Sequence, residues 1–445
     1  MTKESFLIKT RRFPRIFPGW WMNLVTGITS GLGHGFYGYG MSVLFKPIAS
    51  DLGLSRAATS VATGIGRLQG GIEAPITGWL SDRFGPRWVI VVGICFVGTG
   101  LVLMNFITSP WTYYLVWGVV IAIGTNLGLT IAVDKALTDW FIRKRGLALG
   151  IRFVIIGICG VIVLPIISWL VTTQGWRITC LIWSGVMFTG VPFSWFFVKQ
   201  KRPEYYGLLP DGATMESGSV ADIDTMIVRG VDYAASLGET EFTLREAMRT
   251  PAYWLIVTSW ICYTMVMGAF NIHCIPFLTD MGIDPTVAGS MMAMMAFFAV
   301  PARFLGGFLA DRVRKDRLQF LVAGAFLLQS VGITAFLLNQ SIAMAYVLLI
   351  LYGFGSGAPT PMRLTIGGRY FGRKAFASIQ GTSMMFGAPV SFLAPVYAGW
   401  VYDTTGSYTT AFVLFAALAA LGASLMCLVR PPKPPAHITD IRTFV

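Results

Sequence analysis

Five basic side chains occur within long apolar stretches of the sequence, where little water is expected. The five are Arg67, Lys135, Arg152, Arg303 and Arg363. Only Glu73 and Asp134 bring an acidic group to comparable stretches. An arginine near the centre of a lipid-facing helix costs about 2.5–3.5 kcal/mol on insertion scales, so such residues are expected to face protein or a water-filled cavity. The positive surplus would attract an anion.

Arg303 has the most informative surroundings, in the stretch AVPARFLGGFLADRV at 299–313. It precedes Asp311 by eight residues, which places it about 12 Å from the helix end. Small residues share its helix face, while phenylalanines form a separate stripe, so it should point into protein or water. A guanidinium binds a carboxylate through two parallel hydrogen bonds and stays charged. Arg303 is therefore a candidate carboxylate ligand, and a structural arginine bonded to carbonyls or an acid is the alternative.

The other cations each allow two interpretations. Arg152 lies at a depth similar to that of Arg303 and either faces the same cavity or forms a salt bridge with Asp134. Arg363 either reaches the cavity or extends toward the inner membrane surface. Arg67 lies nearer the outer side, where it lines a vestibule or contacts lipid headgroups.

Several uncharged and acidic residues complete the candidate set. Glu73 is the best candidate for a proton carrier, with an ion pair to a nearby arginine as the alternative. The other proton-coupling candidates are His34 and Asp134, although a lone histidine on an apolar helix is more often a hydrogen-bonding residue, as is also expected of His273. The remaining polar candidates either orient a substrate or form interhelical hydrogen bonds. They are Tyr37, Tyr39, Asn126 and Asn271.

Length and composition define the elements that must position these side chains. Of the 445 residues, 55% are hydrophobic and only 12% are charged, too few to cover a soluble protein of this size. Apolar runs long enough to cross a bilayer recur along the chain and predict twelve transmembrane helices. Their expected ranges are 19–43, 58–80, 88–107, 111–134, 146–171, 177–198, 253–278, 288–310, 318–338, 342–366, 375–400 and 409–429.

The net charge of +13 follows the positive-inside rule and does not indicate nucleic-acid binding. If the N-terminus is cytoplasmic, the expected outer segments contain only Lys46, Arg56 and Arg177 as basic residues. Both termini are therefore expected in the cytoplasm, for a protein of the cell membrane. Residues 1–18 contain no separate short apolar segment, so we expect a cytoplasmic segment there and no signal peptide.

Two halves and an internal repeat organise the chain. Offset by 229 residues, DLGL at 51–54 matches DMGI at 280–283, and GWLSDR at 78–83 matches GFLADR at 307–312. We expect a six-helix bundle at 19–198, a cytoplasmic linker with a short surface helix at 199–252, a second bundle at 253–429 and a tail at 430–445. Paired six-helix units with a ligand site between them are typical of secondary transporters.

The loop GWLSDRFGPR at 78–87 resembles the G-x-L-x-D-R-x-G-x-R motif of the major facilitator superfamily. This resemblance implies an all-α integral membrane fold of two pseudo-symmetric bundles, with motif residues that act in conformational change. In this sequence these residues are Gly78, Asp82, Arg83, Gly85, Arg87, Asp311 and Arg312.

Within that superfamily the chain is similar to the monocarboxylate transporter and oxalate:formate antiporter branch. The similar stretches are RGLALG at 145–150, RPEYYGLLPDG at 202–212 and FTLREA at 242–247. The resemblance implies that Arg303 corresponds to the branch's carboxylate-binding arginine. Tyr39 and Ala299 stand near or at the positions of that branch's coupling lysine and aspartate, and 375–400 contains no lysine. Oxalate is therefore expected only if Arg152 or Arg363 supplies a second cation.

These patterns predict a secondary transporter of small carboxylates that works by alternating access as a proton-coupled symporter. Exchange of anions, export of other small solutes and a non-transporting sensor remain as alternatives. The expected partners are a small carboxylate, the bilayer, and protons or a counter-anion, with the protein acting as a monomer. The sequence contains no nucleotide-binding loop, metal-spaced His/Cys cluster or nucleophile elbow, so we expect no enzyme activity, cofactor or metal.

Overall fold

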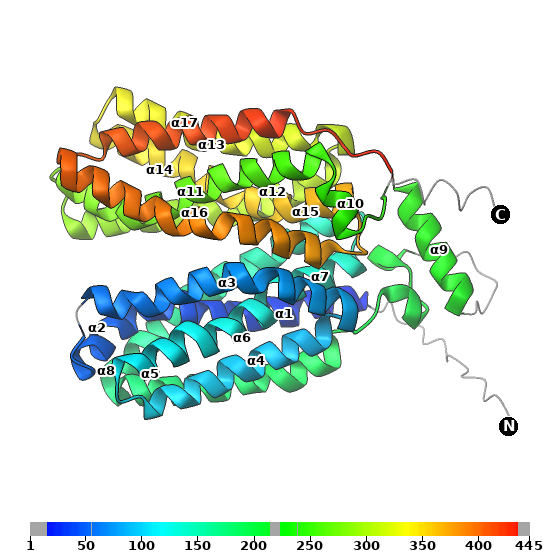
Figure 1. Ribbon diagram of the computed structural model, residues 1–445, viewed down its shortest axis with the longest axis horizontal. Helices are drawn as coiled ribbons and strands as arrows, with labels where there is room; N and C mark the ends of the chain where they lie inside the picture. The colour runs from blue at the N-terminus through cyan, green and yellow to red at the C-terminus, as the bar shows by residue number, and fades with distance from the viewer. Residues whose placement is uncertain (1–15, 55, 214–222, 238, 435–445) are drawn as a thin grey trace.

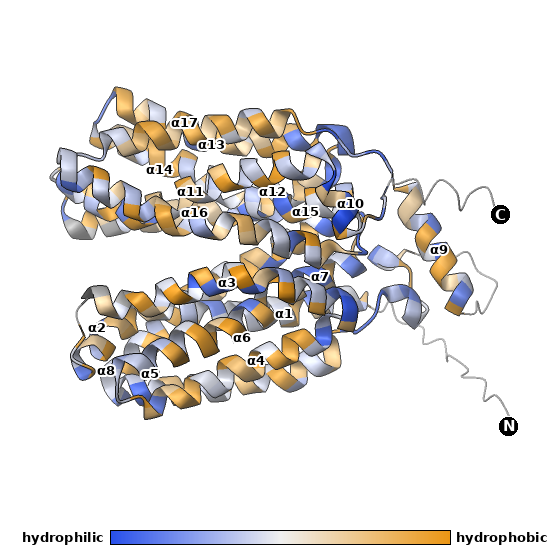
Figure 2. Ribbon diagram, in the orientation of Figure 1, coloured by the Kyte–Doolittle hydropathy of each residue, from blue (hydrophilic) through white to orange (hydrophobic). Residues whose placement is uncertain are grey.

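The computed structural model describes residues 16–54, 56–213, 223–237 and 239–434, and these residues form helices and connecting loops. Among them, nine helices are long and apolar enough to cross a membrane. Large apolar side chains are exposed along their outer faces, as at Trp111, Val161 and Phe297. Figure 2 shows hydrophobic residues along both bundles and hydrophilic residues gathered mainly at the helix ends and loops. The protein is an all-α integral membrane protein.

The first bundle contains residues from Pro18 to Phe197. Its elements are α1 (Pro18–His34), η1 (Gly35–Gly40), α2 (Met41–Asp51), α3 (Arg56–Phe84), α4 (Pro86–Leu103), η2 (Met104–Phe106), α5 (Pro110–Leu115), η3 (Val116–Ile121), α6 (Ala122–Asn126), η4 (Leu127–Ile131), α7 (Ala132–Trp140) and α8 (Arg145–Phe197). The helical stretch α8 turns at Gly175, where φ is 81° and ψ is 164°. Glycine tolerates this backbone conformation, so α8 supplies two crossings.

The second bundle and the linker follow the same chain order. The linker contains η5 (Pro203–Tyr206), η6 (Pro210–Gly212), α9 (Ile223–Ser236) and α10 (Leu244–Met248). The bundle contains α11 (Pro251–Asp280), α12 (Pro285–Arg312), η7 (Lys315–Arg317), α13 (Leu318–Leu338), α14 (Ile342–Gly357), α15 (Pro359–Phe371), α16 (Phe376–Thr405) and α17 (Thr409–Cys427). With α8 counted as two crossings, the helices of the described residues correspond to the twelve predicted ranges.

Figure 1 shows the bundles side by side, with α9 and α10 at one end of the molecule. We call this the linker end. The short helix expected in the linker forms as α10, which begins with a capping box between Thr243 and Glu246. Ala247 of α10 and the preceding Phe242 are buried against the second bundle, where Phe242 meets the ring of Phe371. These residues pack against protein, and the longer α9 was not predicted.

The bundles meet most closely where glycines allow backbones to touch. A side chain at Gly78 of α3 would lie 2.8 Å from the Cα atom of Ser378 in α16. A side chain at Gly307 of α12 would lie 2.8 Å from the carbonyl carbon of Gly146 in α8. Because both contacts lie next to the motif loops, they close the space between the bundles at the linker end.

Candidate functional site

A cavity of about 430 Å³ lies between the bundles. Helices α3, α11 and α16 contribute most of its wall, and η1, α6 and α15 supply one residue each. Its lining residues are Tyr37, Gly66, Arg67, Gly70, Gly71, Asn126, Trp260, Ile261, Thr264, Met267, Gly268, Asn271, Ile272, Arg363, Ser383, Met384, Gly387, Ala388 and Ser391. Five of the predicted site residues therefore come to one place: Tyr37, Arg67, Asn126, Asn271 and Arg363.

The charges on the cavity wall are all positive. Arg67 from the first bundle and Arg363 from the second are the ionic side chains among the described lining residues, and the lining includes no carboxylate. The guanidinium of Arg363 donates from Nη2 to Ser383 Oγ at 2.9 Å and lies over the ring of Trp260 at 5.0 Å. Arg67 is exposed within the cavity. The arrangement suits an anion that interacts with both bundles.

The uncharged polar groups of the cavity are held by packing. The ring of Tyr37 stacks on Trp117, with centroids 5.4 Å apart. A side chain at Gly70 would lie 2.5 Å from Asn126 Nδ2, so the absence of a side chain at position 70 leaves room for this amide. The Oδ1 atom of Asn271 is buried and makes no hydrogen bond to a described residue. The backbone at Tyr39 is part of η1, but its side chain lies outside the described structure.

Arg303 is not one of the described residues that line this cavity. A side chain at Gly157 of α8 would lie 3.3 Å from Arg303 Nη1, so the guanidinium faces the contact between α8 and α12. Its Nε atom is buried without a hydrogen-bond partner among the described residues.

Arg152 forms the salt bridge that was one of its two interpretations. Its Nη1 atom donates to Asp134, and its Nη2 atom donates to the carbonyl oxygen of Leu129 at 2.8 Å. Both charged side chains are buried. Lys135, the next residue, pairs with Asp139 at 2.9 Å and Asp82 at 3.3 Å near the linker end.

The other proton-coupling candidates lie outside the described cavity lining. Glu73 is partly buried and accepts hydrogen bonds from Gln69 at 2.5 Å and Thr77 at 3.4 Å. It forms no ion pair with a described residue, which leaves its carboxyl group without a nearby countercharge. The Nδ1 atom of His34 lies 2.9 Å from the carbonyl oxygen of Ser30. His273 contacts Tyr408 and the Pro395 carbonyl and has the hydrogen-bonding surroundings expected of it.

The motif aspartates join the two bundles reciprocally at the linker end. Asp82 accepts the backbone N–H of Ser378 at 2.8 Å, at the start of α16. Asp311 accepts the backbone N–H groups of Gly146 and Leu147, both at 2.7 Å, at the start of α8. A carboxylate at a helix N-terminus is stabilised by the free N–H groups there. Each bundle therefore caps a helix of the other.

The other motif residues shape the ends of the helices. Arg87 Nε donates to the Val198 carbonyl at 2.6 Å. Arg83 lies over the ring of Trp79, and Arg312 lies over the ring of Phe308 at 4.0 Å. Gly85 has a φ of 82° in the tight connection between α3 and α4, which explains the glycine of the motif.

The sequence interpretation missed a buried ion-pair cluster that includes the linker. Glu239 Oε1 lies 2.5 Å from Arg145 Nη2 of the first bundle, and its Oε2 lies 3.2 Å from Arg373 Nε of the second. Glu204 pairs with Arg373 at 3.3 Å. In the linker, Asp211 accepts the backbone N–H groups of residues 142–144, and Tyr233 donates to it at 3.2 Å. Burial and the Asp211 charge raise the pKa of Tyr233 to about 12.

The comparisons with known proteins agree with this architecture. Residues 24–395 match the sequence profile of the Major Facilitator Superfamily. The chain belongs to this superfamily. Members of the superfamily are membrane transporters, so the protein is a transporter and not an enzyme.

Its relatives include monocarboxylate transporters. The chain is 25% identical to monocarboxylate transporter 13 of Rattus norvegicus over 373 residues, which are 79% of this chain and 75% of the relative. It is 24% identical to the uncharacterized transporter YycB of Bacillus subtilis, with 86% of this chain and 87% of that protein covered.

Solved transporters share the fold at lower sequence identity. The Escherichia coli fucose:proton symporter FucP superposes with a TM-score of 0.67 at 13% identity, over 92% of this chain and 97% of that one. The human organic anion transporter MFSD10 superposes with a TM-score of 0.61 at 15% identity and the same coverage. These similarities support the two-bundle fold alone.

Proposed function

We propose that this protein is a secondary active transporter of small carboxylates. The observation that carries the proposal is the cavity between the bundles, in which Arg67 and Arg363 approach from opposite halves without a carboxylate among the described lining residues. A guanidinium matches the geometry of a carboxylate, and cations from both bundles would bring the halves together around a bound anion. The similarity to monocarboxylate transporters supports the same substrate class.

The contacts between the bundles at the linker end indicate which conformation of the transport cycle this is. The linker end is held by Asp82, Asp311 and Glu239, so access from that end requires these contacts to break. We assign the linker end to the cytoplasm because the predicted inner segments collect the basic residues. We propose that the structure is an outward-facing form in the cell membrane with both termini in the cytoplasm, and that 19–198 and 253–429 rock against each other as units. A single chain supplies the whole pathway, consistent with a monomer.

Arg303 is proposed to join the substrate site when the bundles rock. It lies next to the α8 and α12 contact, where relative movement of the halves changes its surroundings. Because its buried Nε atom has no hydrogen-bond acceptor among the described residues, a carboxylate would supply one. A buried Arg152–Asp134 pair leaves Arg152 less available for the same role.

We propose proton symport as the coupling mode, with Glu73 as the proton carrier. Moving one negative charge inward against 100 mV costs about 2.3 kcal/mol, and a co-transported proton removes this cost. Exchange for another anion removes it equally, so anion antiport is the second candidate. The partly buried Glu73 without an ion pair among the described residues favours the proton.

The experiment combines ligand-induced thermal stabilisation with flux. Purified protein is melted with mono-, di- and tricarboxylates, and the best ligand is tested in proteoliposomes with and without a pH gradient. A ligand at 100 times its Kd stabilises the protein by about 2.7 kcal/mol. Stabilisation should be lost in Arg363→Gln and retained in Arg314→Gln, whose exposed side chain pairs only with Asp316 among described residues.

Two results would contradict the carboxylate proposal, and a third would contradict proton symport. Equal stabilisation of wild type and Arg363→Gln by carboxylates would show that the cavity arginine does not bind them. Stabilisation only by neutral or cationic compounds would exclude the carboxylate class. Flux that ignores the pH gradient but requires an anion on the opposite side would replace symport by exchange.

A further inference from the structure

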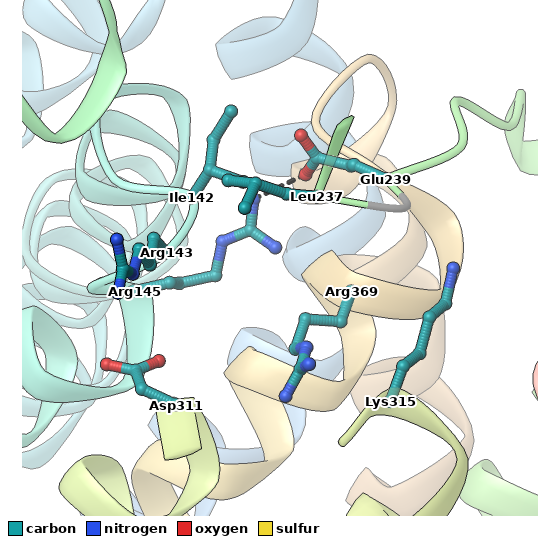
Figure 3. A pocket seen from close by; sticks show the side chains of 8 residues that line it. All are labelled: Ile142, Arg143, Arg145, Leu237, Glu239, Asp311, Lys315 and Arg369. Atoms are coloured by element: carbon teal, nitrogen blue, oxygen red, sulfur yellow. Dashed lines mark hydrogen bonds and ion pairs between the residues drawn. The ribbon is translucent and has the colours of Figure 1, made fainter. Parts of the chain in front are cut away.

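A second cavity, of about 200 Å³, lies at the linker end and is separate from the central one. Its lining comes from the loop before α8 and the first residue of α8, from the linker, and from α12, η7 and α15. The lining residues are Ile142, Arg143, Arg145, Leu237, Glu239, Asp311, Lys315 and Arg369. Figure 3 shows the side chains of Arg145, Arg369 and Lys315 around this space, with Asp311 on the side opposite Lys315.

The two acids in this lining are already satisfied by other groups. Both carboxylate oxygens of Asp311 accept backbone N–H groups at the start of α8. The carboxylate of Glu239 lies between two buried arginines, Arg145 and Arg373. Each acid in the described lining therefore already has partners of its own.

The cations outnumber these acids by four to two. Arg145 is fully buried, yet its Nη1 atom makes no hydrogen bond to a described residue. Its guanidinium lies close against α15, where a side chain at Gly368 would meet its Nε atom at 2.9 Å. A buried donor without an acceptor costs free energy that a bound anion would recover. Arg369 donates to the carbonyls of Ala310 and Val313 at 2.9 and 2.7 Å and keeps its charge beside this space.

We propose that this cavity binds a small, doubly charged oxyanion of the phosphate type. The excess of two positive charges matches such an anion, and a volume of about 200 Å³ accommodates one. Phosphate oxygens accept several hydrogen bonds from arginine and lysine at once. This site differs in place and residues from the central cavity and would bind its ligand from the side of the linker.

The position of the cations gives the site a regulatory consequence. Arg143 and Arg145 belong to the first bundle, while Lys315 and Arg369 belong to the second. These groups surround one space only while the linker end is closed. A ligand that binds one of two conformations shifts the equilibrium toward that conformation, so the anion would hold the linker end closed. An anion present at 100 times its Kd for the closed form would raise the ratio of closed to open molecules by about 100-fold.

The test is thermal unfolding of the purified full-length protein with inorganic phosphate, against chloride at equal ionic strength and without carboxylates. Phosphate should raise the Tm of the wild type. Arg143→Gln and Lys315→Gln should each weaken the apparent phosphate affinity by about ten-fold, the value of one hydrogen bond to a charged group. Arg143 is exposed and Lys315 only partly buried, so both variants are expected to fold.

Matched controls separate this site from other cations. Lys144→Gln makes the same charge change in the same loop but at an exposed side chain outside the cavity, and it should retain the phosphate response. Arg363→Gln should also retain it, because Arg363 lines the central cavity. Loss of the response in Arg363→Gln alone would move phosphate to the central cavity and overturn the proposal.

The source of the phosphate group is distinguished by a second arm with vesicles of phosphatidylcholine, with and without phosphatidate. A response to phosphatidate but not to soluble phosphate, lost in Lys315→Gln, supports the site with a lipid headgroup as ligand. The proposal is overturned if neither probe raises the Tm. It is also overturned if phosphate raises the Tm of Arg143→Gln and Lys315→Gln as much as that of the wild type. If only one of the two substitutions weakens the phosphate response, the proposal that the anion bridges the two bundles is wrong.

Discussion

Substitution of Glu239 by glutamine tests whether the linker holds the bundles together. The carboxylate of Glu239 is 3% exposed and lies between Arg145 and Arg373, whose side chains are each 1% exposed. Removing one partner of a buried ion pair costs about 3–5 kcal/mol, because the remaining charge stays buried without compensation. Arg373 keeps Glu204 as a partner, whereas Arg145 forms no other ion pair with a described residue.

This cost falls on the closed form, because the two arginines come from different bundles. If opening of the linker end returns Arg145 to water, the ratio of open to closed molecules rises by a factor of about 100 to 4,000. We expect Glu239→Gln to populate the form that is open at the linker end under conditions in which the wild type is closed there. The free energy of unfolding should fall by less than the full cost, since opening relieves part of it.

The assay is the distance between spin labels at positions 88 and 320 in a background without cysteine. Both side chains are exposed, near the linker ends of α4 and α13 in different bundles. Glu239→Gln should lengthen this distance. The control is Glu241→Gln, because Glu241 is 35% exposed and pairs with Arg202 at 2.9 Å, an interaction worth about 0–1 kcal/mol. An unchanged distance in Glu239→Gln together with a lower Tm would refute the reasoning and make Glu239 a contact of folding alone.

Three further predictions concern other contacts. Gly307→Val should separate α12 from α8 and lengthen the same label distance, whereas Gly324→Val, where a new side chain meets no atom within 4 Å, should leave it unchanged. Arg152→Ala and Asp134→Ala should each lower the free energy of unfolding by about 3–5 kcal/mol. A double variant that loses less free energy of unfolding than the sum of the single variants would confirm the buried pair, and additive losses would argue against it. Asp211→Ala should lower that free energy by about 1–3 kcal/mol in chemical unfolding, because three backbone N–H groups lose their acceptor; no change would show that water replaces it.

The membrane fold was predictable because its determinants are local and repeated. Apolar runs of sufficient length identify the crossings, and the paired GWLSDR and GFLADR stretches identify the duplicated halves. The sequence also limited Arg152 to two environments, and the structure contains the pair with Asp134. The turn at Gly175 within α8 falls in the expected interval between two helices, where a single glycine permits the change of direction.

The site was less predictable because its geometry depends on how distant helices pack. Tyr37 and Arg363 are far apart in the chain, and only the assembled bundles bring them to one cavity. Arg303 is on a face of small residues, as its spacing indicated, but that face packs on α8 and on the junction of α14 and α15 instead of lining the described cavity. Glu239 was missed because a single acid in a polar linker has no periodic signal, and its partners lie 94 and 134 residues away.

The reciprocal capping by Asp82 and Asp311 implies that opening of the linker end has two separable steps. Each aspartate joins a different pair of helices, α3 with α16 and α12 with α8. One of these two contacts can therefore break while the other remains. If the two contacts break one after the other, opening would pass through a half-released form in which one contact is broken and the other remains. Loss of one of the two aspartate contacts would change the order in which the linker end opens without abolishing the cycle. This redundancy follows from duplication of one ancestral six-helix unit.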